Sequence, residues 1–428
     1  MSSDWQEIKL GTIAPYWTKK IEADRLNEEN YISADNMLAD KGGITDSVYV
    51  PTSGKSTFFE AGDILVSNIR PYFKKIWYAD TSGGCSNDVI VFRTKSELAV
   101  SKFVYYLLSK DDFFDFMMAG ANGTKMPRGN KKSIPQYKVN LPPLKTQQKI
   151  ASILSAYDDL IENNLKRIKL LEEKAQLTYE EWFVRMKFPG HETEVFDDET
   201  GLPEGWEKEK LKDLSKINSQ SINKNFKDNI LYIDIKGVSP NSIDSKTEYA
   251  IEEAPGRAKR IVKHGDIIWS CVRPNRKSHA IIWKPESNWI ASTGFCVISP
   301  KDLPTSYLYQ FLTTDSFVGY LVNLAGGAAY PAVKAEHFKE ADIVVPQKDI
   351  VDKFDNQFAN SIELTWNLKH QNQLLKEARD ILLPRLMTGM IDPSTSSGQV
   401  VGKLDLEEIE GIVTGEKESE YKRNLNQI

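Results

Sequence analysis

Two stretches of the 428-residue sequence concentrate cationic side chains that could bind a polyanion. Residues 116–157 contain seven cations and no acid, and residues 254–285 contain eight cations and one acid, Asp266. Lys and Arg bind phosphates, and bidentate Arg, Lys, Asn or Gln side chains distinguish the edges of DNA bases. The two basic segments therefore predict a nucleic-acid surface, with solvated loops as the alternative for either segment taken alone.

The loops in and beside these segments mix cations with Gly, Asn and Pro. The candidate DNA-binding residues are Arg70, Lys125, Arg128, Asn130, Lys131, Lys132, Arg273, Asn275, Arg276, Lys277 and Lys334. Neutralising cations such as Lys131 and Lys132 should weaken binding to all DNA alike and flatten its salt dependence. Base-reading side chains should instead contribute to sequence choice.

The overall composition is compatible with nucleic-acid binding but does not by itself indicate it. The formal net charge is −5, so the basic segments stand in an acidic background. The N-terminus lacks a signal-peptide pattern, and no apolar stretch approaches the length of a membrane span. We expect a cytoplasmic protein that has no membrane partner. The three scattered cysteines predict buried thiols rather than a disulfide framework or a CxxC metal site.

Catalytic motifs are not found in the sequence. There is no HExxH, no GxxxxGK[ST] and no GxSxG, and the five histidines lack metal-ligand spacing. The string NLPPL at 140–144 lacks the aromatic residue of an amino-methyltransferase motif and is interpreted as a connector. We expect no catalytic, cofactor-binding or metal site in this chain. A fused methyltransferase or nuclease, which would need such a motif, is the enzymatic alternative.

The chain repeats itself with an offset that drifts from 201 to 204 residues. The matched blocks are WQEIKL at 5–10 with WEKEKL at 206–211, GDILVSNIRP at 62–71 with GDIIWSCVRP at 265–274, AGANGTKMP at 119–127 with LAGGAAYP at 324–331, and VNLPPLKTQQKI at 139–150 with IVVPQKDIVDKF at 343–354. Four blocks in one order indicate a duplication. Arg70 and Arg273 are equivalent, so each could contact DNA or brace the fold through an ion pair. Residues that differ between the halves are better candidates for reading bases.

Each half begins with a mixed region and ends in a long helical pattern. Short runs rich in β-branched and aromatic residues predict strands at 64–66, 89–92, 267–269, 280–283 and 296–298. The first helix should follow Pro142-Pro143 and end near Lys187, before Pro189-Gly190. The second should follow Pro346, with Pro384 breaking or kinking it and Gly389 at its end.

Both helical patterns carry a heptad seam, which is rougher in the second helix. The first seam comprises Leu154, Tyr157, Ile161, Asn164, Ile168, Leu171, Ala175, Thr178 and Trp182, and the second comprises Phe358, Ser361, Thr365, Leu368, Asn372, Leu375 and Leu382. Asn164 and Asn372 could fix the helix register or face solvent beside the seam. The residues proposed for helix pairing or partner docking are Leu154, Ile161, Asn164, Ile168, Leu171, Phe358, Leu368, Asn372 and Leu375.

These patterns predict an α+β chain in which two repeated mixed α/β domains are separated by two long antiparallel helices that form a coiled-coil rod. The expected segments are domain one at 1–144, the central helix at 145–187, domain two at 188–346, the distal helix at 347–392 and an acidic tail at 393–428. Antiparallel pairing would return the end of the chain to domain one. The tail should be flexible, with a short helix at 404–412 as an option.

The motifs together resemble the DNA-specificity subunits of type I restriction–modification systems. Two domains opened by W-x4-L and containing GDI-x6-RP resemble target recognition domains, and 141–190 resembles the central helix of that family. LPEGWE at 202–207 looks like the start of a second recognition domain, and 374–392 looks like the end of the distal helix. The resemblance covers about residues 1–392.

The resemblance implies a noncatalytic subunit whose two domains each read one half of a bipartite site in double-stranded DNA. The helices would act as a ruler and would dock two methylation subunits, which would bind S-adenosylmethionine. Restriction subunits would join the complex and use ATP and Mg²⁺. The alternative function is a protein-binding coiled-coil scaffold without sequence-specific DNA binding, and the basic segments argue against it.

Overall fold

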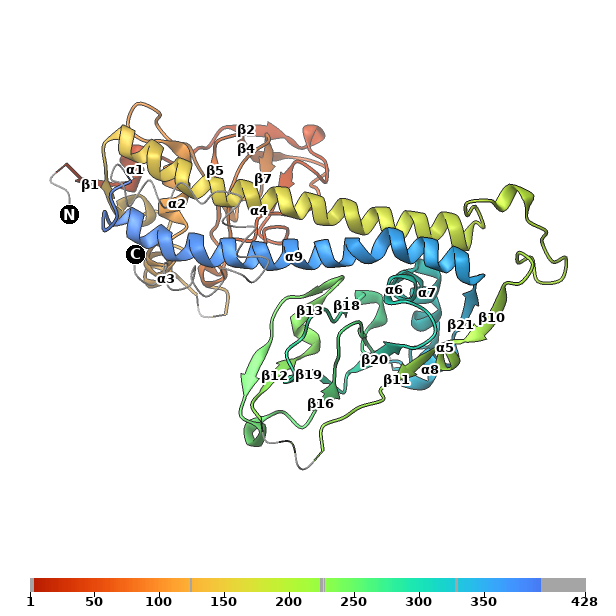
Figure 1. Ribbon diagram of the computed structural model, residues 1–428. Helices are drawn as coiled ribbons and strands as arrows, with labels where there is room; N and C mark the ends of the chain where they lie inside the picture. Colours follow the sequence, from red (N-terminus) through yellow and green to blue (C-terminus); the bar gives the residue numbers. More distant parts are fainter. Residues whose placement is uncertain (1–3, 124, 224–225, 227, 328–329, 394–428) are drawn as a thin grey trace. The chain divides into compact units, whose positions relative to one another are not determined.

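The computed structural model describes residues 4–123, 125–223, 226, 228–327 and 330–393, which form two compact units (Figure 1). The first unit contains residues 4–163 and 370–393, and the second contains residues 164–369. Each unit therefore combines one mixed domain with half of each long helix. The expected tail helix at 404–412 lies outside the described residues.

The first unit contains two small sheets, a separate two-stranded ladder and three short helices. One sheet has the order β2 (Lys20–Glu22), β4 (Lys55–Phe59), β7 (Gly83–Cys85), β3 (Tyr31–Ile32), and the other has the order β6 (Ile76–Tyr78), β5 (Ile64–Ser67), β8 (Val89–Phe92). The ladder joins β1 (Gln6–Lys9) to β9 (Lys138–Leu141), and the helices are α1 (Leu10–Ile13), α2 (Ser101–Leu108) and α3 (Asp111–Ala119).

The second unit repeats this plan with longer strands. Its sheets have the orders β11 (Ser215–Ile217), β20 (Phe295–Pro300), β17 (Ile267–Ser270), β18 (His279–Ile281) and β15 (Thr247–Tyr249), β12 (Ile230–Ile233), β19 (Trp289–Ser292), β16 (Ala258–Ile261). Two ladders join β10 (Glu207–Lys210) to β21 (Asp342–Val345) and β13 (Val238–Ser239) to β14 (Ser242–Ile243). The helices are α5 (Leu211–Leu214), α6 (Thr305–Thr313), α7 (Asp315–Leu324) and α8 (Ala335–Lys339).

The central strands β5 and β17 show why the repeat folds alike. All four residues of each strand are buried, as expected for apolar runs covered on both faces. Equivalent antiparallel registers place Ile64 opposite Phe92 and Ile267 opposite Ile298. The five strand predictions are confirmed, with shifts of one or two residues at their ends.

The first long helix, α4, spans Leu144–Tyr179 and begins directly after Pro142-Pro143, as predicted. It continues as a π-helical turn over Glu180–Val184, so helical structure ends before the expected Lys187. Tyr179 and Phe183, four residues apart, are both buried in an aromatic cluster with Tyr307 and Phe354. A π turn inserts one extra residue and can re-aim the buried face of a helix. The seam therefore moves from the expected Thr178 and Trp182 to Tyr179 and Phe183.

The second long helix, α9, spans Lys348–Met387 and contains Pro384. Of the two outcomes predicted for Pro384, a break is wrong because the helix continues for three residues beyond it, and a kink stays a prediction. Leu383, Leu386 and Met387 on either side are buried in the core of the first unit, and this packing offsets the missing hydrogen bond. Gly389, with φ 72°, follows the helix as expected.

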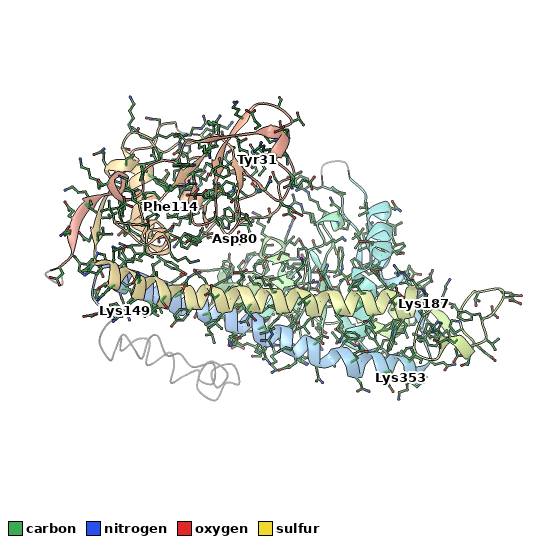
Figure 2. The ribbon with its side chains drawn as sticks, turned by 90° about the horizontal axis from the view of Figure 1, so that it is seen from above. Tyr31, Asp80, Phe114, Lys149, Lys187 and Lys353 are labelled. Atoms are coloured by element: carbon green, nitrogen blue, oxygen red, sulfur yellow. The ribbon has the colours of Figure 1, made fainter. Side chains whose placement is uncertain are left out.

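The two long helices pack antiparallel within each unit (Figures 1 and 2). In the first unit the Arg379 guanidinium donates to Asp158 Oδ1 at 2.7 Å, and Asn372 Nδ2 lies 3.4 Å from the Ile161 carbonyl oxygen. In the second unit the Lys369 ammonium donates to Glu172 Oε1 at 2.9 Å. Residue numbers rise along α4 as they fall along α9, which confirms the predicted antiparallel pairing.

The seam residues are mostly buried, so the structure uses them for internal packing. Leu154, Ile161, Asn164, Ile168, Phe358, Leu368, Asn372 and Leu375 are buried, and Leu171 is partly buried. Asn164 and Asn372 are each 5% exposed, so neither faces solvent. A partner protein would meet other side chains of these helices.

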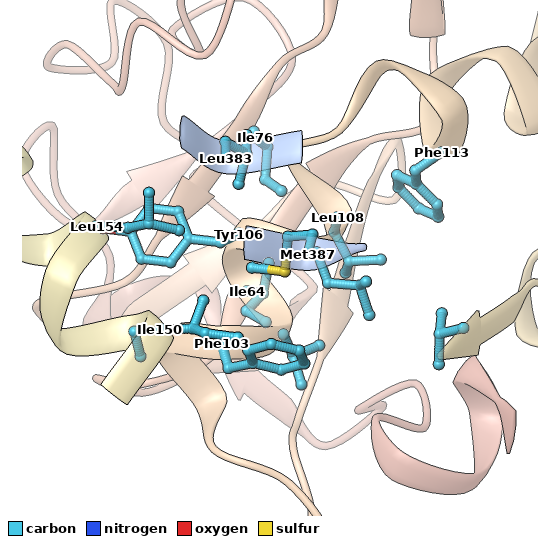
Figure 3. Packing of buried hydrophobic residues seen from close by; sticks show 14 of the residues in the cluster. Ile64, Ile76, Phe103, Tyr106, Leu108, Phe113, Ile150, Leu154, Leu383 and Met387 are labelled. Atoms are coloured by element: carbon cyan, nitrogen blue, oxygen red, sulfur yellow. The ribbon is translucent and has the colours of Figure 1, made fainter. Parts of the chain in front are cut away.

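The core of the first unit joins its domain to both helices (Figure 3). Ile64 and Phe103 from the domain belong to the same buried cluster as Leu154 of α4 and Met387 of α9. The cluster extends to Ile391, so the chain returns to the first domain after α9, as predicted. The second unit is built in the same way, with Tyr179 and Phe354 in the cluster that contains Ile267.

Candidate nucleic-acid interface

In each unit the segment after the central strand lies against the glycine-containing loop that follows α3 or α7. The Arg70 N–H donates to the Pro127 carbonyl at 2.7 Å, and Ile69 forms a β-bridge with Arg128. The second unit repeats both features, with Arg273 N–H to the Pro331 carbonyl at 2.7 Å and a bridge from Val272 to Ala332. The fold therefore brings together two loops that lie about 60 residues apart in sequence.

Backbone conformation explains why the glycine-containing loops can turn so tightly. Gly123 has φ 92° and Gly327 has φ 101°, values that L residues adopt only with strain. A Cβ atom on Gly327 would lie 3.1 Å from the Tyr330 carbonyl oxygen, and one on Gly123 would lie 3.4 Å from that of Met126. Each loop is closed by a second bridge, Asn122 to Arg128 and Gly326 to Ala332.

The predicted cations of the first unit gather on this loop. Lys125, Arg128, Lys131 and Lys132 are all exposed. The Arg128 guanidinium pairs with Asp88 at 3.2 Å, and Lys131 Nζ donates to the Asn87 carbonyl at 3.0 Å. Both contacts hold the glycine-containing loop against the segment between β7 and β8.

Asn130 has a local structural role. Its Oδ1 atom accepts the Lys132 backbone N–H at 2.9 Å, and its carbonyl accepts the backbone N–H groups of Ser133 and Ile134. This Asx turn orients the two lysines that follow. The Asn130 carboxamide oxygen is therefore already engaged before any nucleic acid binds.

One alternative for the repeated arginines is an ion pair that braces the fold. Arg70 does not form such a pair with the residues that the structure describes. No carboxylate in the described part of the chain pairs with Arg70, and its Nε atom is buried without a hydrogen-bond partner there. The Arg273 guanidinium lies over the Tyr330 ring, 4.7 Å from the ring centroid. Stacking on an aromatic face favours a cation by about 0.5–1 kcal/mol at exposed sites.

The second unit presents its predicted residues on both loops. Asn275 and Arg276 are exposed, and their side chains make no hydrogen bond or ion pair with the residues that the structure describes. Lys277 Nζ pairs with Asp315 at 2.8 Å, and this ammonium lowers the pKa of the Asp315 carboxyl. Lys334 is exposed at the N-terminus of α8.

Other cations of the two basic segments serve the fold. Lys138 pairs with Glu7 across the β1–β9 ladder at 2.8 Å. Lys284 pairs with Glu363 of α9, and the Arg260 Nη1 atom donates to Ser221 Oγ at 3.3 Å. The basic segments are therefore only partly available to a nucleic acid, although the loop cations named above remain exposed.

Sequence reasoning missed the aromatic residues of the first interface. Tyr72 is 46% exposed and Phe73 is 37% exposed, with ring centroids 4.6 Å apart. Met126 and Tyr330 occupy equivalent places before the loop prolines and are also exposed. The signal that could have found them is the repeat itself, because these positions differ between two otherwise matched blocks.

The described residues contain neither a metal-ligand cluster nor a membrane-spanning helix. Among them, no group of three or more His, Cys, Asp or Glu side chains is placed to hold a metal ion. None of the described helices is both long and apolar enough to cross a membrane. Of the five histidines, His279 is buried against Trp269 and Tyr309.

Relatives of known family align with two thirds or more of the chain. A family model described as "type I restriction modification DNA specificity domain" matches twice, at residues 2–173 and 203–374. The type I restriction enzyme HindI specificity subunit of Haemophilus influenzae is 24% identical over 91% of this chain and 100% of its own. The MjaIX specificity subunit of Methanocaldococcus jannaschii is 26% identical over 68% of this chain and 69% of its own.

Solved structures also align with most of the chain. The type I restriction–modification S subunit from M. genitalium is 14% identical, with a TM-score of 0.48, over 90% of this chain and 96% of its own. The two family matches fall on the two halves that the internal repeat defines, and together they cover more than half of the chain. The chain therefore belongs to the family of type I restriction–modification DNA-specificity subunits.

Proposed function

We propose that each unit of this specificity subunit reads one half of a bipartite site in double-stranded DNA. Within each unit, the contact surface is formed by the turn after the central strand and the glycine-containing loop bonded to it. Phosphate contacts from exposed cations would position the unit, and side chains at the loop tips would choose the bases. The chain itself is noncatalytic, as expected for a specificity subunit.

The observation that carries this proposal is the repetition of one two-loop surface with different side chains. Arg70 and Arg273 bind equivalent proline carbonyls at the same distance. The exposed residues at equivalent positions beside them differ, with Tyr72 and Phe73 in the first unit and Asn275 and Arg276 in the second. One scaffold with two different sets of exposed side chains is what a reader of two different half-sites needs.

The long helices are proposed to set the interval between the half-sites and to dock two methylation subunits. Leu165, Leu170 and Leu177 of α4 are exposed, although comparable residues of the seam are buried. These leucines leave apolar surface on the helix that a protein partner would cover on binding. The buried seam residues would then pack the two helices against each other and would not contact the partner.

The reactions are assigned to the partners. We propose that the methylation subunits bind S-adenosylmethionine, and that restriction subunits join the complex and use ATP and Mg²⁺. The complex would act in the cytoplasm, where the DNA is. The scaffold alternative has no support among the relatives, which are specificity subunits.

A domain exchange tests the modular reading. Replacing residues 1–141 with the matching domain of a relative of different specificity is expected to change one half of the methylated site and leave the other unchanged. The reciprocal exchange of residues 203–345 should change only the other half. The readout is the methylated motif in cells that also express the methylation subunit. An exchange that altered both half-sites would contradict the proposal.

A further inference from the structure

The turn after each central strand has the same backbone in both units. Arg70 and Arg273 both adopt left-handed conformations, with φ 48° and 52°, and a 3-10 turn follows at Pro71–Phe73 or Pro274–Arg276. Lys74 and Lys277 then return to left-handed conformations, with φ 50° and 52°. Such conformations are uncommon for residues other than glycine and persist where the surroundings enforce them.

Tertiary contacts enforce this conformation at both ends. At the start, the Arg70 and Arg273 N–H groups donate to the loop proline carbonyls. At the end, the Lys74 ammonium pairs with Asp111 at 2.9 Å, which is the first residue of α3. Lys277 makes the equivalent pair with Asp315, the first residue of α7. Each turn is thus held within its own unit by the same pair of anchors.

Between these anchors the two units share a proline, and the two residues that follow it differ completely in chemistry. The first unit places Tyr72 and Phe73 there, and the second places Asn275 and Arg276. All four side chains are exposed, and the two aromatic rings contact each other. Neither pair supports the core of its unit, because none of the four is buried.

We propose that these central pairs determine the base choice of their units, an inference that rests on the proposed function. The flanking arginine and lysine are positioning residues that hold the turn. Asn and Arg can form bidentate hydrogen bonds with adenine and guanine in the major groove. Tyr and Phe can contact a thymine methyl group or insert beside a base step. The first turn therefore selects by apolar contact and the second by hydrogen bonds.

An exchange of the central pairs tests this assignment in the whole complex. The variant Y72N/F73R gives the first turn the side chains of the second, and the variant N275Y/R276F does the reverse. Each is expressed with the methylation subunit, and methylated sites are sequenced across the host genome. Each variant is expected to change one half-site only, at one or two base pairs. Preference for the original base over its competitors should fall at least about tenfold.

The matched control is Lys132→Gln, which neutralises an exposed cation on the neighbouring loop. This variant should lower the extent of methylation at all sites without changing the motif. If either double exchange fails to yield folded protein, the single variants Tyr72→Ala, which removes the apolar ring, and Asn275→Asp replace it, with relaxed choice expected at one base pair.

The outcomes separate this inference from the proposed function. A bipartite motif that stays unchanged in both exchange variants, at normal methylation, would overturn the role of the central pairs and leave the modular function standing. Lower methylation with an unchanged motif would also overturn it, because the turns would then contribute only affinity. The absence of any bipartite motif with the unaltered chain would instead count against the proposed function.

Discussion

Replacing Arg93 with alanine is expected to destabilise the first unit by about 3–5 kcal/mol, because it strands a buried carboxylate. The Arg93 guanidinium donates to both oxygens of Asp63, at 2.8 and 2.7 Å, and pairs with Glu60 at 2.9 Å. Asp63 is 2% exposed, and among the residues that the structure describes its carboxylate keeps only the Glu60 backbone N–H as another donor. Hydrogen exchange of the β5 and β8 amides in increasing urea measures the loss.

The second unit supplies the control for this prediction. Asp266 is equivalent to Asp63 in the repeat. Ser299 is equivalent to Arg93, because each follows the residue paired with the first residue of the central strand, Ile298 or Phe92. Burial raises the pKa of the Asp266 carboxyl, and the Ser299 hydroxyl bond opposes this rise. Ser299→Ala should therefore cost no more than about 1 kcal/mol. The double variant D63N/R93A should recover part of the loss, because a neutral amide needs no counter-charge.

An Arg93→Ala loss below about 1 kcal/mol would contradict this account, because it would mean that Asp63 does not depend on its partner. Equal losses from Arg93→Ala and Ser299→Ala would contradict it as well. The comparison also shows that the shared GDI motif conserves a buried carboxylate between the repeats while the group that satisfies it differs.

The second unit is expected to lose about 3 kcal/mol of stability as the pH falls from 6.5 to 4. Burial lowers the pKa of His279 to about 4, and the Lys277 and Lys369 ammonium groups act in the same direction. Above pH 6.5 the imidazole is neutral in both the folded and unfolded states, so it costs nothing. Below that value the unfolded chain takes up a proton that the folded chain refuses, and stability falls until the pH reaches the folded pKa.

The surroundings of His279 explain the shift and provide a control. Its ring stacks on Trp269, and its Nδ1 atom lies 3.0 Å from the Tyr309 hydroxyl. That hydroxyl donates to Asn241 Oδ1 at 2.6 Å, so His279 Nδ1 acts as the donor to the tyrosine oxygen. In the second unit the strand register places Trp269 opposite His279. The equivalent register in the first unit places Val66 opposite Ile76.

His279→Ile is therefore the matched variant, since the first unit uses isoleucine at this place. Urea unfolding of both proteins at pH 7 and pH 5 isolates the contribution of the imidazole, because the carboxyl groups are common to both. The unaltered chain should lose about 2 kcal/mol more than the variant between these values. The same pH dependence in both proteins would show that His279 is protonated as readily in the folded state as in the unfolded state.

Much of the architecture could be predicted from the sequence, because the patterns that define it are long or repeated. The duplication, the two long helices, their antiparallel pairing and the central strands are confirmed. The family and the noncatalytic role as a specificity subunit are confirmed by the relatives. Each of these predictions rests on many residues, so no single local exception could overturn it.

The errors arise where tertiary contacts override local preference. Proline normally ends a helix, but Pro384 lies between leucines that the first core buries. The π turn begins after Tyr179, which lies in an aromatic cluster with Tyr307 and Phe354. These two rings are distant in sequence, so a heptad pattern cannot predict their contact with the helix. The end of α4 was therefore misplaced by three residues.

The candidate interface shows the same limit. Clustered charge alone does not separate Lys138, which pairs with Glu7 across a ladder, from Lys132, which is exposed. Only the Gly and Asn of the loop place Lys132, and not Lys138, among the candidate residues. The left-handed conformation of Arg70 depends on a carbonyl nearly 60 residues away, and local sequence does not encode that bond. Tyr72 and Phe73 are aromatic residues of a kind that usually lies in a core, so their type alone does not predict their exposure.

The most direct test of the specificity role is methylation sequencing of a host genome with and without this gene, with the methylation subunit present in both strains. We expect a methylated bipartite motif that disappears when the gene is removed, which would reveal both half-sites at once. Co-purification with the methylation subunit establishes that the partner is bound in the strain that carries the gene. Methylation that is identical in the two strains despite a bound partner would contradict the assignment of this chain as the reader of the site.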